Sequence, residues 1–155
     1  MKHVEVPALR QKLVPIWADA SCALILLASA GGKLMSLGNQ SALYDKVHPL
    51  FSVSYKTVAV GVTILEVLAV ASCMISRKVF RALTLLLGAN FLAYHILVKT
   101  IGIQEPCKCL GRLLTAFPRL ADHESQVAVG LAGLLIAFSL VGSLSTRVWQ
   151  EGETA

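Results

Sequence analysis

Four long apolar blocks, separated by polar stretches, constrain this chain more than any other feature. A helix needs roughly 20 mostly apolar residues to cross a membrane, because the hydrocarbon core is about 30 Å thick and each residue rises about 1.5 Å. Each of the four blocks reaches or nearly reaches that length, and the last carries no charged residue. The blocks cover residues 16–36, 57–75, 79–98 and 127–144.

The composition indicates that these blocks lie in lipid rather than in a soluble core. The chain is 55% hydrophobic and 15% charged, whereas a soluble domain is typically about a quarter charged. Too little polar surface remains to cover four buried helices. Because a segment in lipid must satisfy its own backbone hydrogen bonds, the blocks are predicted to be helices. We therefore expect an all-α fold: one membrane domain over residues 1–155, built as an up-down four-helix transmembrane bundle.

The lengths of the links predict how the helices are arranged. The three-residue link 76–78 makes the second and third helices antiparallel neighbours, and one compact bundle is the economical solution. The small residues 28–30, which follow basic residues and an apolar run, also resemble a signal-peptide cleavage site. However, the apolar block continues past Lys33, so we expect the first block to stay in the bundle.

The distribution of basic residues gives a prediction of sidedness. Lys and Arg are equally numerous on the two sides, but Arg77, Lys78 and Arg81 crowd the shortest link without an acid nearby. Cytoplasmic links carry an excess of Lys and Arg. We therefore expect a multi-pass membrane protein with both termini in the cytoplasm. The net charge of +5 is spread too thinly for nucleic acid and suits anionic lipid headgroups.

The link between the third and fourth blocks contains Cys107-Lys108-Cys109. A thiol reacts as the thiolate, and a neighbouring cation such as Lys108 favours that form. A disulfide between cysteines two apart lies near the upper Cα separation of about 6.8 Å, so it would be strained and easily reduced. This pattern predicts a pair that cycles between dithiol and disulfide outside the cytoplasm, where disulfides persist.

Other roles for the two cysteines remain open. They are either incidental, or static links to a partner chain, or ligands of a soft metal together with His123 and with His95 or His48. The usual zinc spacing leaves two to four residues between paired cysteines, which counts against the metal.

The order of these motifs resembles the MauE/DoxX family of redox-associated membrane proteins. The likeness covers residues 17–144 and rests on Gly32-Lys33-Leu34, Leu65-Glu66 and Cys107-Lys108-Cys109-Leu110-Gly111. The chain departs from the family pattern at Leu110, where phenylalanine is usual. The resemblance implies disulfide handling with a thioredoxin-like or client protein outside the cytoplasm. The architecture is similar to that of vitamin K epoxide reductase, so a quinone is implied by analogy only.

Polar residues inside the blocks are further candidates for a site. A carboxylate in hydrocarbon is expensive and normally faces a partner, so we expect Glu66 to pair with Lys33, either as a structural ion pair or as a proton relay. Asn90 is expected to hydrogen-bond the same carboxylate. His95 either handles a proton near the outer end or anchors at the headgroup level.

Three expectations concern groups away from this pair. Asp19 is expected to be solvated near the inner membrane surface. Cys22 and Cys73 are expected to behave as small buried hydrophobes at similar depth. Small residues of the fourth block are expected to form a close-packing face: Ala128, Ala132, Gly133 and Ala137.

Two functions follow from these patterns. The first is thiol–disulfide redox handling, as a possible oxidoreductase, through Cys107 and Cys109 with Lys108 favouring the thiolate. The second is a non-catalytic membrane scaffold or metal-binding module for an extracytoplasmic partner.

Overall fold

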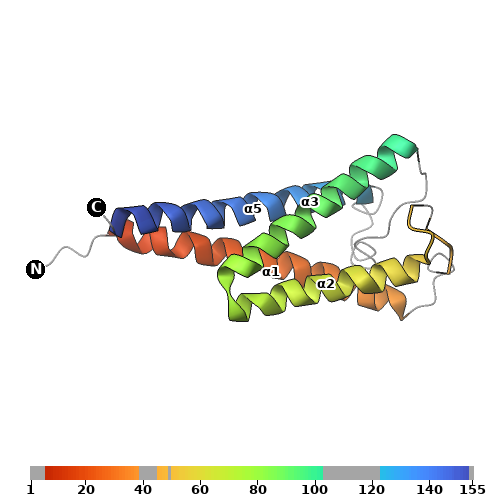
Figure 1. Cartoon of the computed structure of the whole chain (residues 1–155), viewed down its shortest axis with the longest axis horizontal. Coiled ribbons are helices and arrows are strands. Elements are labelled where there is room, and N and C mark those ends of the chain that lie inside the picture. The colour runs from red at the N-terminus through yellow and green to blue at the C-terminus, as the bar shows by residue number, and fades with distance from the viewer. Residues whose placement is uncertain (1–5, 39–44, 49, 103–122, 154–155) are drawn as a thin grey trace, which may run out of the picture.

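The computed structural model describes residues 6–38, 45–48, 50–102 and 123–153. Each of the four apolar blocks forms one helix (Figure 1). Each helix is longer than its block, because it includes polar residues that flank the block. No strand occurs in these described ranges, so the predicted all-α fold is confirmed. The helices are α1 (Val6–Leu37), α2 (Tyr55–Ile75), α3 (Arg77–Ile101) and α5 (Glu124–Glu153).

All four helices are long and apolar enough to cross a membrane, over Leu13–Leu37, Tyr55–Ile75, Arg77–Ile101 and Glu124–Thr146. Large apolar side chains such as Leu24, Leu68, Ile75 and Leu144 are exposed along them. A soluble protein does not leave so much apolar surface in water. The chain is therefore an integral membrane protein.

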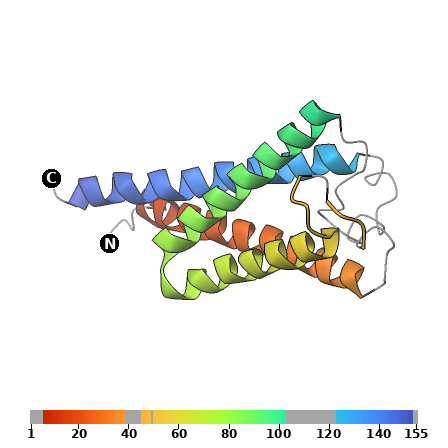
Figure 2. The same ribbon diagram turned by 45° about the vertical axis from the view of Figure 1, so that its right-hand side comes forward.

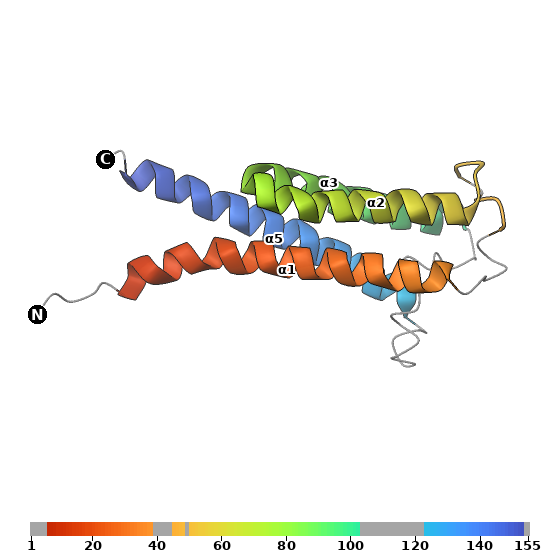
Figure 3. The ribbon, with the colours of Figure 1, turned by 90° about the horizontal axis from the view of Figure 1, so that it is seen from below.

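The helices form a ring in which α1 packs on α2 and α5, and α3 packs on the same two helices. Successive helices run in opposite directions (Figure 3), as the predicted up-down topology requires. Both termini and the α2–α3 turn lie at one end, named here the termini end. The C-terminal ends of α1 and α3 and the N-terminal ends of α2 and α5 lie at the other, named here the loop end.

The ends of α2 and α3 have clear local causes. Ser54 caps α2, because its Oγ accepts the backbone N–H of Thr57 at 3.2 Å. Only Ser76 separates α2 from α3, in an extended conformation with φ −156°, so the link is shorter than the predicted three residues. Gly102 ends α3 at φ 73°, a left-handed backbone conformation that favours glycine.

The core lies where α1, α2, α3 and α5 meet, and its fully buried members are Cys22, Leu26, Ala69, Phe80 and Leu135. Cys73 packs against this cluster and is half-buried, and both thiols are free. The prediction that Cys22 is a small buried hydrophobe is thus confirmed, and for Cys73 it holds in part.

The contact between α3 and α5 is close because α3 has no side chain at Gly88. A Cβ there would lie 3.0 Å from Ile136 Cγ1 and 3.3 Å from the Ala132 carbonyl oxygen. Ala128 and Ala132 are buried as predicted, but Gly133 and Ala137 are exposed. The predicted small-residue face was therefore wrong for those two, because the buried stripe of α5 runs through Ala128, Ala132, Leu135 and Ser139.

Candidate functional site

A buried ion pair joins α1 to α2 in the half of the bundle nearer the loop end. Lys33 Nζ lies 2.7 Å from Glu66 Oε1, and the two side chains are 4% and 0% exposed. Ser29 lies one turn before Lys33, so both point to the same face of α1. Its Oγ donates to Glu66 Oε1 at 2.8 Å and accepts from Lys33 Nζ at 2.6 Å. The predicted pairing of Lys33 with Glu66 is thus present, and a serine that the sequence did not single out completes it.

The second oxygen of the carboxylate has a different environment. Glu66 Oε2 is buried and makes no hydrogen bond to any described group. A cavity of about 30 Å³ adjoins the pair and is lined by Glu66, Lys33, Ser29 and His95, among others. A cavity of this size can hold one water molecule. The site therefore combines a carboxylate, an ammonium group and an imidazole around one small space whose remaining walls are apolar.

His95 and Phe91 on α3 complete the surroundings of the pair. His95 is 9% exposed, and its ring contacts Tyr94 edge-on at 5.6 Å between centroids. A buried imidazole facing this cavity does not fit the role of a headgroup anchor, and its role in proton handling stays a prediction. Lys33 Nζ lies 5.4 Å from the centre of the Phe91 ring, within reach of a cation–π contact.

Asn90 does not contact Glu66, and that prediction was wrong. Its Nδ2 donates to the Leu86 carbonyl oxygen at 2.8 Å, one turn back on α3, and the residue is exposed. Asn90 instead lines the space between α2 and α3.

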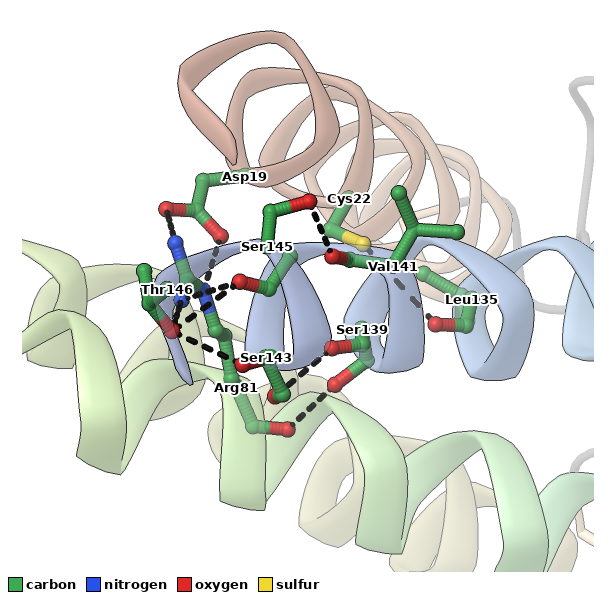
Figure 4. A network of polar contacts seen from close by, with 10 residues as sticks. Asp19, Cys22, Arg81, Leu135, Ser139, Val141, Ser143, Ser145 and Thr146 are labelled. Atoms are coloured by element: carbon green, nitrogen blue, oxygen red, sulfur yellow. Dashed lines mark hydrogen bonds and ion pairs between the residues drawn. The ribbon is translucent and has the colours of Figure 1, made fainter. Parts of the chain in front are cut away.

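A second buried polar network lies near the termini end and joins α1, α3 and α5 (Figure 4). Arg81 Nε donates to Asp19 Oδ1 at 2.7 Å, and Arg81 Nη2 donates to Asp19 Oδ2 at 2.8 Å. Arg81 Nη1 donates to the Gly142 carbonyl oxygen at 2.6 Å and to Thr146 Oγ1 at 3.2 Å. Asp19 is 6% exposed, so the expectation that it is solvated was wrong: the bidentate guanidinium replaces water.

The backbones of α3 and α5 also contact this network closely. A Cβ at Gly142 would lie 3.0 Å from Arg81 Nε, and Ser139 Oγ donates to the Arg81 carbonyl oxygen at 2.7 Å. The sequence did contain a signal for the pair: an acid in the first block and a base in the third lie at the same predicted depth. Arg81 of α3 binds both Asp19 of α1 and Gly142 of α5, so we assign the network a structural role in holding the three helices together.

Cys107, Lys108 and Cys109 lie outside the described residues. Their two described flanks, Gly102 after α3 and His123 before α5, lie at the loop end, the end that Figure 2 brings forward. Within the described ranges, no group of three or more His, Cys, Asp or Glu side chains is placed to share a metal ion. The metal alternative drew on the two cysteines as well and stays a prediction.

Comparison with known proteins gives one match. A family model described as Methylamine utilisation protein MauE matches residues 11–149, a range that includes both buried polar networks and the Cys-Lys-Cys segment. No curated protein and no solved structure matches the chain.

Proposed function

This chain belongs to the family of the methylamine utilisation protein MauE, and from that premise we propose that it handles thiol–disulfide redox chemistry for a protein outside the cytoplasm. Cys107 and Cys109 are the proposed reactive pair, and Lys108 favours the thiolate. The proposed partner is a thioredoxin-like or client protein. Kinship with the DoxX branch of redox-associated membrane proteins belongs to the same proposal.

One observation carries this proposal: the flanks of the Cys-Lys-Cys segment lie at the loop end, where α1 and α3 end, and Lys33 and His95 of the buried cluster lie near the C-terminal ends of those two helices. Five chain steps of at most about 3.6 Å separate Gly102 from Cys107, whereas α3 is about 38 Å long at about 1.5 Å per residue. The connectivity of the chain therefore supports assigning the thiols to the same half of the bundle as the buried cluster.

The chemistry needs a route for protons as well as electrons. Oxidising two thiols to a disulfide releases two protons and two electrons. We propose that the cavity between Glu66 and His95 takes up or passes on protons in this half of the membrane, with Lys33 holding the carboxylate in place. Buried ionisable groups in membrane spans commonly mark such relays. In the exchange, the dithiol of one protein is oxidised as the disulfide of the other is reduced, so the two electrons pass between the Cys107–Cys109 pair and the partner.

The proposed location is the bacterial inner membrane with both termini in the cytoplasm. The termini lie at the same end as the α2–α3 turn, where Arg77 and Lys78 are exposed, and cytoplasmic ends are rich in such residues. Arg81, which the sequence analysis counted with these two residues, is buried against Asp19 and therefore gives less support to a cytoplasmic location of this end. The loop end then faces the oxidising side.

The direct test is to trap the exchange partner. In cells that express Cys109→Ser in place of the natural protein, we expect a mixed disulfide between Cys107 and the partner, visible as a reducible higher-mass species. Cys107→Ser is tested in parallel, since either cysteine could attack first. Neither variant forming such a species, while Cys22→Ala and Cys73→Ala proteins remain functional in the pathway, would contradict the proposal.

A further inference from the structure

A second and much larger cavity, of about 520 Å³, lies between α2 and α3. The two helices are linked at Ser76 and diverge toward the loop end (Figures 1 and 2), so the space between them widens toward that end. We call this space the wedge cavity. Its lining runs from Tyr55 to Leu65 on α2 and from Leu83 to Leu97 on α3. On α2 the lining therefore covers the half of the helix that begins at the loop end.

The length of the wedge cavity matches one leaflet of a membrane. The rise from Tyr55 to Leu65 is about 15 Å at about 1.5 Å per residue. Half of a hydrocarbon core of about 30 Å is also about 15 Å. A lipid acyl chain that belongs to the leaflet at the loop end therefore fits the length of the cavity.

The walls of the wedge cavity are helical stripes of apolar side chains. On α2 the stripe includes Val58, Val62 and Leu65, and on α3 it includes Leu83 and Leu86. Such cavities stay free of water and take apolar ligands. Leu65 and Leu86 are more than half exposed, so an apolar chain enters from the surrounding hydrocarbon.

A hydrogen-bond donor stands at the wide end of the wedge cavity. His48 Nδ1 accepts the backbone N–H of Leu50 at 3.1 Å, so the neutral ring carries its proton on Nε2. That Nε2 donates to Tyr94 Oη at 2.8 Å. The Tyr94 hydroxyl proton is then free to donate, and Tyr94 lines the cavity. This end therefore offers a donor to an acceptor oxygen at the top of an apolar chain.

The same end lies at the level where lipid headgroups begin. The His48 ring lies 4.5 Å from that of Tyr55 and 5.7 Å from that of Tyr94 between centroids, and tyrosines are enriched at the membrane interface. Lys46 and Lys56, beside these rings in the chain, are exposed, and Asp45 is the sole acid within residues 45–48 and 50–56. Basic residues at this level attract anionic headgroups.

A transmembrane helix of a second copy or of a partner does not fit the same space. A helix about 10 Å across fills roughly 1,200 Å³ over a length of about 15 Å. The wedge cavity holds less than half of that volume. A single acyl chain is thin enough to enter, so lipid is the occupant that the dimensions favour.

From these features we propose that the wedge cavity binds one anionic phospholipid of the leaflet at the loop end. One acyl chain lies between α2 and α3. An ester carbonyl oxygen of the lipid accepts the Tyr94 hydroxyl proton, and the phosphate lies near Lys56. This inference goes beyond the proposed thiol chemistry and does not rest on it, because none of its residues belongs to the Cys-Lys-Cys segment.

The test uses the full-length protein in phosphatidylcholine nanodiscs that contain a small fraction of phosphatidylglycerol with a diazirine on one acyl chain. Peptide mass spectrometry maps the labelled residues after illumination. We expect saturable labelling on the cavity faces of α2 and α3 that unlabelled phosphatidylglycerol abolishes. Native mass spectrometry is expected to show one retained phospholipid per chain. Labelling spread over all lipid-facing helices, or a lipid-free dimer, overturns the proposal.

Matched variants place the acyl chain and the ester. Ala93 lines the wedge cavity, and Ala82 is exposed on the same helix outside it. Ala93→Trp is expected to reduce labelling at least tenfold, whereas Ala82→Trp labels like the natural protein. Tyr94→Phe removes only the donor hydroxyl and is expected to weaken binding about fivefold. Undiminished labelling in both Ala93→Trp and Tyr94→Phe overturns the proposal.

A second pair of variants places the headgroup. Labelling by the phosphatidylglycerol probe is compared with labelling by a phosphatidylcholine probe that carries the same acyl chains. Lys56→Gln is expected to lower the preference for the anionic probe about fivefold. Lys78→Gln, at an exposed position at the termini end, is expected to leave the preference unchanged. Equal labelling of the natural protein by the two probes overturns an anionic headgroup at this site.

Discussion

Lys33 of α1 lies 2.7 Å from Glu66 of α2, and the same lysine borders both internal cavities. On one side the ion pair faces His95 across a space that can hold one water molecule. Lys33 also lines a cavity of about 520 Å³ between α2 and α3. One buried ion pair therefore adjoins two cavities in the half of the bundle nearer the loop end.

Two variants test whether the ion pair stabilises the fold: one removes the charge of the acid alone, and the other replaces both partners by apolar residues. Glu66→Gln leaves a buried ammonium without its counter-ion, so we expect it to destabilise the protein by about 3–5 kcal/mol, measured by unfolding in detergent. Lys33→Met combined with Glu66→Leu is expected to recover most of that loss, because a buried pair is often replaceable by apolar residues. A Glu66→Gln protein as stable as the natural one would show that the pair does not hold the helices.

The double variant also distinguishes a purely structural role of the ion pair from a role in proton handling. If Glu66 takes part in the redox step, the stable Lys33→Met/Glu66→Leu protein oxidises its partner more slowly, by at least tenfold, and the rate loses its pH dependence. A rate equal to that of the natural protein would assign the pair to structure alone.

The Asp19–Arg81 network is expected to hold α1, α3 and α5 together at the termini end. Arg81→Lys keeps the charge but loses the bidentate contact, and we expect a loss of about 2–4 kcal/mol, since a charge stays buried with poorer geometry. Arg77→Lys, at an exposed position on the same helix, is the matched control and should change stability by less than about 0.5 kcal/mol. Equal stability of the two variants would contradict the assignment.

Glycine-to-alanine substitutions test the close approach of α3 and α5. At Gly88 a Cβ would meet Ile136 and Ala132 at 3.0–3.3 Å, so Gly88→Ala is expected to destabilise by about 1–3 kcal/mol. At Gly130 nothing lies within 4 Å, and alanine there is expected to be neutral or to stabilise by up to about 1 kcal/mol. Thermal unfolding of both variants measures the difference, and an equal response would show that the helices do not pack at this distance.

The loop of residues 45–48 and 50–54 is expected to loosen in acid. His48 is buried at 1% exposure, and burial lowers its pKa from the ordinary value of 6.5. The unfolded loop therefore binds more protons than the folded one as pH falls below about 6.5, so the stability of the loop, full above that pH, decreases. Hydrogen exchange of the loop amides at pH 7.5 and 5.5 measures this. His48→Asn should flatten the pH dependence, and an unchanged dependence in that variant would assign it to another group.

Much of this fold was predictable because the membrane imposes a simple rule on sequence. Four apolar blocks predicted four spanning helices, since backbone groups in lipid have no other partners. The Lys33–Glu66 contact was predictable for a related reason: a carboxylate in hydrocarbon requires a partner at similar depth.

The features that the sequence did not predict depend on how each helix is rotated about its axis and on how far neighbouring helices diverge. Asn90 bonds its own helix and lines the space between α2 and α3 instead of contacting Glu66, and Asp19 is buried because Arg81 turns inward to bind it. The cavity between α2 and α3 depends on the divergence of these helices, which no residue pattern encodes. The sequence offered His48 only as a candidate metal ligand, and its contact with Tyr94 of α3 depends on how the preceding loop folds back, which no residue pattern predicts.

The central claim is that Cys107 and Cys109 form a reversible disulfide outside the cytoplasm. In a Cys22→Ala/Cys73→Ala background, intact cells are treated with a membrane-impermeant maleimide before and after an impermeant reductant. The account predicts no label at first and two labels per chain after reduction. Labelling that appears only once the cells are permeabilised, or two thiols that react without reduction under oxidising conditions, would contradict it.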